Sequence, residues 1–355
     1  MSIRGSFPAP NTYLERGWMK ILIIGGTGLI SVSITKFLIE RGNDVTLFNR
    51  GKSCLSTHPS TKVIHGDRTD YPTFEAQIVE AGKFDVVVDM VGYQPEDGES
   101  AVRAFGGRVG HFIFCSTVDV YRKPAFRYPV VETEPYGGVN PYSSNKVIIE
   151  KRLIEAQNKG AFPLTIIRPA YTYGESRSPV TPLSGKYFFD RIRRGKPIVV
   201  HGDGSSFWTA CHRDDVARAF VAAAYNPNTF GKTYHTPGEE WMTWDIYIRR
   251  AAEAIGVPDP KIVHIPTDVL GRVSPKRAFL VVTNFQFSNI FDTTAARNDL
   301  NFCYTIPWVE GVHRMAIWME ENNRIENSDQ DPFEDRLVTA WEQMGTQMTE
   351  TFKEE

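Results

Sequence analysis

Met19-Lys-Ile-Leu-Ile-Ile-Gly25-Gly-Thr-Gly28-Leu-Ile-Ser31 is the stretch that decides the fold. Its first six residues form an apolar run typical of a buried parallel strand. The glycines predict a tight turn, and the residues from Leu29 to Arg41 predict a helix. Such a turn lets backbone N–H groups approach a pyrophosphate, whose charge the helix N-terminus favours. Ser31 stands where a third glycine is expected, and it is small enough for close helix–sheet packing.

The alternation of strand and helix continues beyond this stretch. Further strands are predicted at 44–48, 61–65, 84–89, 111–115 and 164–168, and helices at 74–81, 99–106 and from Pro141 to about Gly160. This spacing predicts an α/β protein with a doubly wound parallel Rossmann sheet. After Gly174 the pattern changes, which predicts a smaller mixed α/β domain over the carboxyl edge of the sheet.

We expect four parts along the chain. They are an extension (1–18), a dinucleotide-binding domain (19–180), a mainly substrate-binding domain (181–320), from which some segments return to the first, and a C-terminal tail (321–355). Within the tail, the residues from Phe333 to Met344 are open to two interpretations, a docking helix or a disordered segment.

Composition excludes several classes of protein. The 355 residues carry a net charge of -2, which implies no general attraction to nucleic acid or to an anionic membrane. No apolar run approaches the ~20 residues that cross a bilayer. The four cysteines are scattered without metal-like spacing, so we expect reduced thiols, no metal site and a cytoplasmic protein.

Tyr142 and Lys146 form a candidate acid–base pair. They stand at i and i+4 in a predicted helix, so their side chains share one face. A cation within ~4–6 Å favours a phenolate, and a lowered pKa brings the phenol nearer to neutral pH, where proton transfer is most effective. A surface tyrosine and lysine that merely share a helix face have the same spacing.

In order and spacing, the motifs resemble the extended short-chain dehydrogenase/reductase superfamily, in particular its NAD-dependent epimerase/dehydratase group. The resemblance runs from Met19 to about Trp318. Thr117 precedes Tyr142 by 25 residues, which is similar to the spacing between the Ser/Thr and the Tyr in the family. The matching motifs are the Gly25–Gly28 turn, Gly66-Asp67, Ser116-Thr117, Tyr142/Lys146, Arg168-Pro169, and Gly202-Asp203-Gly204 leading to His212-Arg-Asp214-Asp215.

The resemblance implies a role for each matching residue. Thr117 would hydrogen-bond the substrate oxygen, Tyr142 would move the proton, and Lys146 would bind the nicotinamide ribose and lower the pKa of the phenol. Asp67 would hold the adenine amino group. The expected cofactor contacts are Gly25, Thr27, Gly28, Leu29, Ile30, Asn49, Arg50, Asp67, Arg68, Val91, Gly92, Lys146 and Pro169, and the expected substrate contacts are Tyr93, Thr117, Tyr171 and Trp208.

The end of the second strand bears on the choice between NAD and NADP. An acid usually holds the 2′-hydroxyl of NAD there. This chain has Asn49, 21 residues after Gly28, followed by Arg50 and Lys52. An amide beside cations can accept a 2′-phosphate, so NADP is slightly favoured over NAD. The alternative interpretation is that Arg50 and Lys52 are solvated loop charges without a role in cofactor binding.

Two departures from the family pattern concern the substrate. Trp208 stands near the place of an arginine that clamps a nucleotide-sugar diphosphate, and Tyr171 near that of an asparagine. These aromatic side chains are equally consistent with the wall of a substrate pocket and with packing in the core. Family dehydratases carry an acid pair, or a small residue and Glu, after the catalytic Thr, whereas Val118-Asp119 leaves one carboxylate, Asp119, as an extra acid/base.

The leading hypothesis is an NAD(P)-dependent enzyme of the epimerase/dehydratase type that transfers a hydride at a carbinol or ketone carbon of a sugar or polyol derivative. A net NADP-dependent reductase of a non-nucleotide substrate is the alternative. The segments around Trp241-Met-Thr-Trp244-Asp and Pro275-Lys-Arg-Ala-Phe279 also resemble the chloroplast stem–loop RNA-binding branch. A non-catalytic RNA-binding module therefore stays open, as does a homodimer.

Overall fold

The computed structural model describes residues 17–52, 58–176 and 178–353. Residues 1–16 of the expected extension, and Cys54, lie outside the described residues. The chain divides into two compact units, each described by itself below. The first comprises Met1–Thr172, Cys211–Gly238 and Phe291–Thr305, and the second Tyr173–Ala210, Glu239–Ile290 and Ile306–Glu355. Two later segments of the chain thus belong to the first unit.

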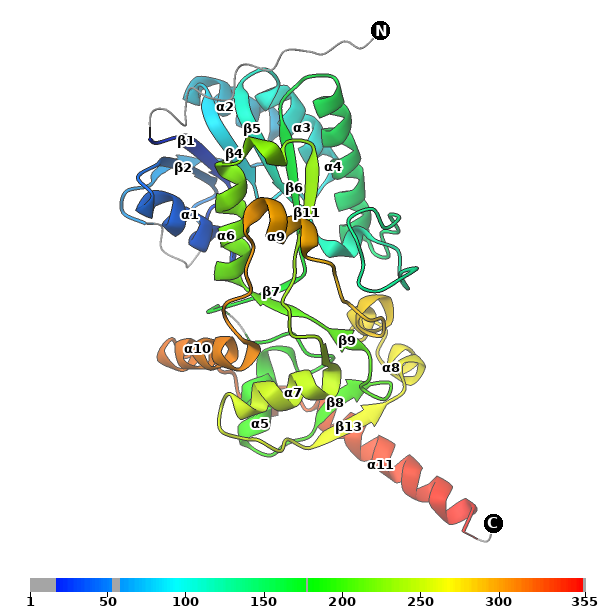
Figure 1. Ribbon diagram of the computed structural model, residues 1–355. Coiled ribbons are helices and arrows are strands. Elements are labelled where there is room, and N and C mark those ends of the chain that lie inside the picture. The colour runs from blue at the N-terminus through cyan, green and yellow to red at the C-terminus, as the bar shows by residue number, and fades with distance from the viewer. Residues whose placement is uncertain (1–16, 53–57, 177, 354–355) are drawn as a thin grey trace. The chain divides into compact units, whose positions relative to one another are not determined.

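A parallel sheet forms the centre of the first unit (Figure 1). Seven described strands pair in the order β11-β6-β5-β4-β1-β2-β3, and every pair is parallel. The strands are β1 (Lys20–Ile24), β2 (Asp44–Asn49), β3 (Lys62–His65), β4 (Phe84–Asp89), β5 (Val109–Cys115), β6 (Leu164–Pro169) and β11 (Lys232–Thr236). The predicted doubly wound fold is confirmed, and the sequence missed β11.

Helices cover both faces of this sheet, which explains why its central strands are almost entirely apolar. Residues of α1 and α6 pack on one face, and residues of α2, α3 and α4 pack on the other. The helices are α1 (Ser31–Glu40), α2 (Tyr71–Ala81), α3 (Pro95–Phe105), η1 (Val118–Val120), α4 (Pro141–Asn158), α6 (Arg213–Ala224), η3 (Pro227–Thr229) and α9 (Thr294–Leu300).

The start of α4 is fixed by local chemistry. Asn140 accepts a hydrogen bond from the backbone N–H of Ser143, and the Ser143 hydroxyl interacts in return with the Asn140 backbone. Pro141 occupies the first turn, where its missing N–H costs nothing. The helix therefore begins one residue before Tyr142, and Lys146 follows one turn later as predicted.

The second unit is mixed α/β. Its strands are β8 (Ile198–His201), β9 (Phe207–Trp208), β12 (Met242–Thr243) and β13 (Ile262–Ile265), while β7 (Tyr171–Tyr173) and β10 (Ala210–His212) lie where the chain passes between units. Its helices are η2 (Gly185–Tyr187), α5 (Phe188–Arg193), α7 (Trp244–Glu253), α8 (Thr267–Val273), η4 (Val281–Phe285), α10 (Trp308–Glu321), η5 (Ser328–Gln330) and α11 (Phe333–Thr351).

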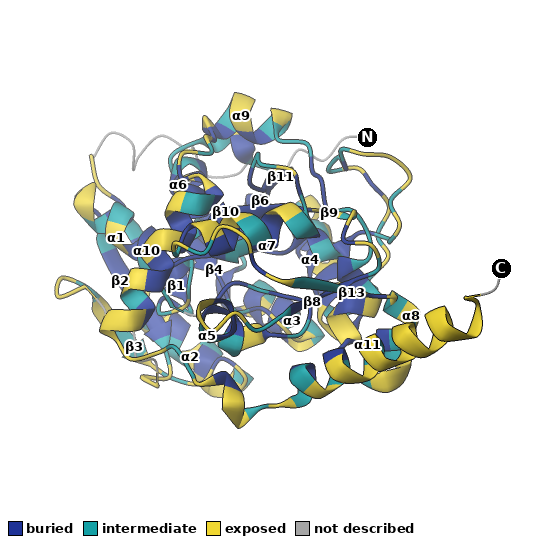
Figure 2. Cartoon of the chain, turned by 90° about the horizontal axis from the view of Figure 1, so that it is seen from below, coloured by how far each residue is buried: buried dark blue, intermediate teal, exposed yellow. Residues whose placement is uncertain are grey.

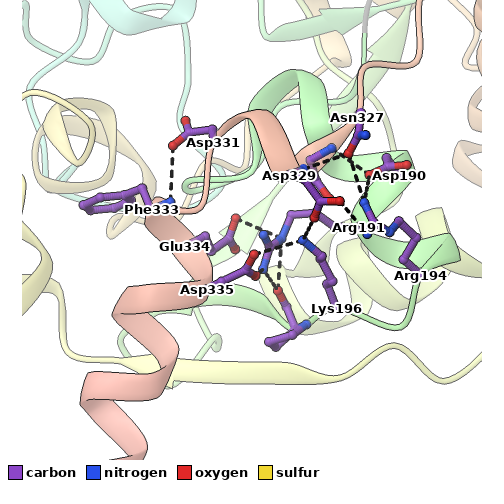
Figure 3. A network of polar contacts seen from close by, with 12 residues as sticks. Asp190, Arg191, Arg194, Lys196, Asn327, Asp329, Asp331, Phe333, Glu334 and Asp335 are labelled. Atoms are coloured by element: carbon purple, nitrogen blue, oxygen red, sulfur yellow. Dashed lines mark hydrogen bonds and ion pairs between the residues drawn. The ribbon is translucent and has the colours of Figure 1, made fainter.

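The tail forms the long helix α11, whose first turn is anchored by buried charges (Figure 3). The Glu334 carboxylate accepts hydrogen bonds from the Val199 N–H at 2.7 Å and from the Ser184 hydroxyl. Arg191, 1% exposed, pairs with Glu334 at 3.3 Å and with Asp335 at 2.7 Å. Beyond Trp341 every described residue of the helix is exposed (Figure 2).

Candidate active site

The glycine turn after β1 has the shape of a phosphate cradle. Gly25 has a φ of +84°, and a Cβ there would lie 2.2 Å from Val91 Cγ1. A Cβ on Gly26 would lie 2.4 Å from Leu47 Cδ2. Ser31, at the third-glycine place, accepts a hydrogen bond from the Gly28 N–H at 2.8 Å and donates one to the Gly25 carbonyl at 2.7 Å. Its hydroxyl thus closes the turn.

The rest of the turn remains accessible. Gly28 is exposed, and Thr27, Leu29 and Ile30 are half-buried. The α1 helix begins after Ile30 without a side-chain cap. The Val32 and Ser33 N–H groups bond the Gly28 and Ile30 carbonyls, and the positive end of the helix dipole favours an anion. These residues fit the pyrophosphate of a dinucleotide.

The ends of β2 and β3 bring together the residues expected to select the cofactor. The Asn49 side chain accepts a hydrogen bond from the Gly51 N–H at 2.8 Å. Hydrogen bonds from Thr69 hold the pKa of Asp67 below its usual value, and Arg50 and Lys52 lie near enough to add to this effect. Both cations are exposed and flank the Asp67 carboxylate, where the adenosine end of a dinucleotide is expected.

Arg68 does not lie on the surface of this site. It is 6% exposed and pairs with two carboxylates, Asp89 at 3.0 Å and Asp97 at 3.4 Å, each 1% exposed. The sequence predicted Arg68 as a cofactor contact, and it did not predict a role in the site for Asp89 or Asp97. No local pattern joins the three, because Arg68 follows β3, whereas Asp89 ends β4 and Asp97 lies in the first turn of α3.

Thr117, Tyr142 and Lys146 meet beyond the carboxyl end of β5. Thr117 caps η1 by accepting a hydrogen bond from the Asp119 N–H at 3.2 Å, and it also hydrogen-bonds the Tyr142 hydroxyl. The Lys146 ammonium lies 5.9 Å from the centre of the Tyr142 ring and donates a 2.7 Å hydrogen bond to the Cys115 carbonyl. The structure therefore brings these three predicted side chains together.

The electrostatics of the pair differ from the prediction. Burial raises the pKa of Tyr142, with smaller contributions from Cys115, Tyr93 and Asp119, against which the Thr117 hydrogen bond acts. Although 42% of the residue is exposed, desolvation is the largest cause. The helix spacing favoured a lowered pKa, whereas burial raises it, because the spacing carries no information about desolvation. At neutral pH Tyr142 is a phenol that can donate a proton.

Lys146 is almost fully buried, at 1% exposure. Burial lowers the pKa of its ammonium, while the nearby Cys115, Asp89, Glu150 and Asp97 act in the opposite direction. Aromatic rings surround the nitrogen, with ring centres at 4.9 Å for Tyr93 and 4.7 Å for Phe114.

The loop between β4 and α3 carries Val91, Gly92 and Tyr93. A Cβ on Gly92 would lie 2.8 Å from Phe114, so the backbone passes close to β5. The Tyr93 ring lies 6.3 Å from that of Tyr142, centre to centre, and burial raises the pKa of its hydroxyl to about 12. Val91 contacts the glycine turn and Tyr93 the catalytic pair, so this short loop adjoins both parts of the site.

The remaining predicted residues are placed as follows. The Asp119 carboxylate pairs with Lys123 at 3.3 Å. Pro169 is buried at the end of β6, and Tyr171 is half-buried. Trp208, 5% exposed, packs in the second unit against Trp244 and Phe285, with ring centres 4.9 and 5.0 Å away. This aromatic packing explains why the Trp208 side chain is buried within its own unit.

Behind α4 lies a polar network that the sequence did not indicate as part of the site. Arg168 donates to Glu150 at 2.9 Å and to the Tyr121 hydroxyl at 2.5 Å, and Tyr121 contacts His235 at 2.5 Å. Glu150 follows Lys146 by one helical turn. The network therefore joins α4 to β6, β11 and the segment after η1.

A dinucleotide cradle after β1 and a Thr–Tyr–Lys set beyond β5, on a doubly wound sheet, define an enzyme of the extended short-chain dehydrogenase/reductase type. The model of the NAD dependent epimerase/dehydratase family matches residues 21–236, and the chain belongs to that family.

The chain is similar to several known proteins. It is 34% identical over 259 residues to the chloroplast stem-loop binding protein of 41 kDa b of Arabidopsis thaliana, covering 69% of this chain and 65% of that relative, slightly less than two thirds of its length. It is 24% identical to 2′-dehydrokanamycin reductase of Streptomyces kanamyceticus, covering 89% of this chain and 88% of the relative.

Among solved structures, UDP-glucuronic acid 4-epimerase from Bacillus cereus, in complex with UDP-glucuronic acid and NAD, matches with a TM-score of 0.67 at 17% identity. The match covers 86% of this chain and all of that chain (100%), and it shows a shared fold. In the part of the chain that the structure describes, no helix has the length and apolar character needed to cross a membrane.

Proposed function

We propose that this protein binds NAD(P) in its first unit and transfers a hydride at a carbinol or ketone carbon of a sugar or polyol derivative. The bound nicotinamide supplies or accepts the hydride. The residues that would hold the cofactor are the turn from Gly25 to Ile30, the Asn49–Arg50 and Asp67 region, the Val91–Gly92 segment and Lys146.

The observation that carries the proposal is the meeting of Thr117, Tyr142 and Lys146. Thr117 orients the substrate oxygen by a hydrogen bond. Tyr142 gives its proton to that oxygen as the carbonyl is reduced, and takes it back in the opposite direction. Lys146 anchors the ribose and holds a positive charge beneath the phenol.

The test for this function starts from the purified protein. Mass spectrometry and fluorescence first establish whether a dinucleotide is retained. A retained cofactor that cycles during epimerisation or dehydration supports internal redox, whereas NADPH that is consumed in proportion to product supports a net reductase. No binding of either dinucleotide, with a folded protein, would contradict the proposal.

Net reduction is favoured by the likeness to a relative that is named a reductase. Dehydration requires a further acid or base, and Asp119 would have to leave its ion pair with Lys123 to serve as one. Epimerisation at a single carbon needs no such carboxylate.

NADP is the proposed cofactor in preference to NAD. Asn49 supplies no carboxylate for a 2′-hydroxyl, and the exposed Arg50 and Lys52 add positive charge beside Asp67. An arginine binds phosphate through charged, often bidentate hydrogen bonds.

A second candidate, RNA binding, is favoured by the 34% identity to a protein named for binding stem-loops. The net charge of -2 supplies no general attraction to phosphate. Titration with a stem-loop RNA at physiological salt decides it. Nanomolar binding without any affinity for dinucleotides would favour this candidate over the enzyme.

A further inference from the structure

We propose that Arg68, Asp89 and Asp97 are positioning residues that hold the loop Val91–Gln94 so that Tyr93 covers the Lys146 ammonium beside Tyr142. The catalytic meaning of this arrangement rests on the proposed function, whereas the arrangement itself is open to a separate test. We call Arg68, Asp89 and Asp97 the buried triad.

The three residues of the buried triad are joined to one another by charged hydrogen bonds. The Arg68 guanidinium donates to the Asp89 carboxylate at 3.0 Å, and to the carboxylate and backbone carbonyl of Asp97 at 3.4 and 2.6 Å. The guanidinium carbon also lies 4.7 Å from the ring centre of Phe74, and the Tyr71 hydroxyl hydrogen-bonds Asp97. All three residues are at least nine-tenths buried, so water screens their attraction only weakly.

The two carboxylates accept hydrogen bonds from the backbone of the loop. Asp89 accepts a hydrogen bond from the Val91 N–H at 3.0 Å. Asp97 accepts hydrogen bonds from the Tyr93 and Gln94 N–H groups at 2.8 and 2.9 Å. These loop N–H groups therefore donate to two carboxylates, and the Arg68 guanidinium holds both carboxylates in place by hydrogen bonds.

The opposite side of the loop is tied to the catalytic helix. The Asn145 side chain, between Tyr142 and Lys146, donates to the Tyr93 carbonyl at 3.0 Å and to the Gln94 side chain at 3.1 Å. With both sides held, the Tyr93 ring lies with its centre 4.9 Å from the Lys146 nitrogen.

Tyr93 completes an aromatic enclosure around this nitrogen. Phe114 and Tyr142 supply the other rings, at 4.7 and 5.9 Å. The groups with negative or potentially negative charge near it are Asp89, Asp97, Glu150 and Cys115, together with the two phenols. The same two acids that place Tyr93 thus also act on the Lys146 charge, which burial alone would disfavour.

A labelling experiment on the full chain, without cofactor or substrate, tests the placement. The rate at which an amine-reactive anhydride modifies Lys146 is measured against pH by mass spectrometry of the peptides. The midpoint of this profile reports the protonation of the amine, and its plateau reports how often the nitrogen reaches solvent. A loss of redox activity therefore leaves this result unaffected.

Removing the cover should change both quantities. For Tyr93→Ala we expect the midpoint to rise by about one pH unit, since water then solvates the ammonium, and the plateau to rise at least about tenfold. Asp97→Ala should also raise the plateau, because the loop is released. Its midpoint has a second influence, since removing the Asp97 carboxylate lowers the pKa of the ammonium. This variant leaves Arg68 and Asp89 as a balanced pair, so it introduces no isolated buried charge.

Two variants serve as matched controls. Tyr93→Phe keeps the ring, and Glu96→Ala removes an exposed carboxylate from the same first turn of α3. Both should retain the wild-type profile. An Asp97→Ala plateau equal to that of the wild type would overturn the positioning role, and an unchanged Tyr93→Ala profile would overturn the cover.

If Asp97→Ala does not fold, hydrogen exchange of the wild type decides the question. The Tyr93 and Gln94 amides are expected to exchange as slowly as amides within α3, because buried carboxylates accept their hydrogen bonds. Exchange at the rate of an unstructured peptide would overturn the proposal.

Discussion

Arg168 and Glu150 form a hydrogen-bonded ion pair that is almost completely buried, with side-chain exposures of 3% and 0%. Glu150 lies on α4, one turn beyond Lys146, and Arg168 lies on β6. The guanidinium also contacts the Tyr121 and Tyr136 hydroxyls, so a single cation joins α4 to the segment that follows Thr117.

Breaking this pair should destabilise the protein strongly. Glu150→Ala leaves the Arg168 charge buried without its carboxylate, and we expect a loss of about 3–5 kcal/mol in the free energy of unfolding. Urea denaturation followed by circular dichroism measures it. Glu155→Ala, which removes an exposed partner of Lys159 on the same helix, is the control and should have little effect. Equal stability of the two variants would contradict the account.

The catalytic role that we propose for Tyr142 predicts that dinucleotide binding and turnover respond differently to its substitution. Tyr142→Phe keeps the ring near Lys146 and removes the proton, so dinucleotide affinity should be nearly unchanged. Turnover should fall by about two orders of magnitude or more, the usual contribution of a positioned acid or base. Calorimetric titration and steady-state rates measure the two effects. Wild-type turnover in the variant would remove Tyr142 from the mechanism.

The proposed preference for NADP depends on Arg50. Losing a charged hydrogen bond to the 2′-phosphate costs about 1.5–3 kcal/mol, which is roughly 10–150-fold in affinity. Arg50→Ala should therefore weaken NADP far more than NAD in parallel titrations. Arg108→Ala removes an equal charge just before β5, at the amino edge of the sheet, and should affect neither. Matched losses for both dinucleotides would show that Arg50 does not contact the 2′ position.

His111 should make the protein sensitive to acid. Burial lowers the pKa of its imidazole to about 3, while the unfolded chain has an ordinary value near ~6.5. Between these values only the unfolded chain binds the proton, so stability is lost as the pH falls below ~6.5.

The size of this loss can be measured against a variant. Between pH 6.5 and 5 the free energy of unfolding should fall by about 1.5 kcal/mol more in the wild type than in His111→Gln. The comparison of slopes removes any difference in absolute stability, and it leaves the other buried histidines in place. Parallel slopes would show that His111 titrates normally.

The sequence predicted the parts of the fold that local patterns encode. Six of the seven described strands follow from apolar runs that lie between helices. The seventh, Lys232-Thr-Tyr-His-Thr236, has no such run, and it becomes a strand because it pairs with β6 far back in the chain. The return of residues 211–238 to the first unit likewise depends on contacts distant in sequence.

The same limit applies to the site. Motif spacing predicted that Thr117, Tyr142 and Lys146 would meet. It could not predict the buried triad, because Arg68, Asp89 and Asp97 come from three different elements. The direction of the Tyr142 pKa shift also depends on desolvation by the folded surroundings, which helix spacing does not encode.

Titration of the full-length protein with NADP and NAD, beside the variant Gly28→Val, tests the central claim most directly. Gly28 does not have a positive φ, and among the described residues a Cβ there would lie 3.3 Å from the Ser31 hydroxyl and 3.8 Å from the Gly25 carbonyl. Valine there should leave the fold intact and fill the space that a pyrophosphate needs. The account predicts micromolar binding by the wild type and a loss of at least about tenfold in the variant, or 1.4 kcal/mol. Equal affinities, or no binding by a folded wild type, would contradict it.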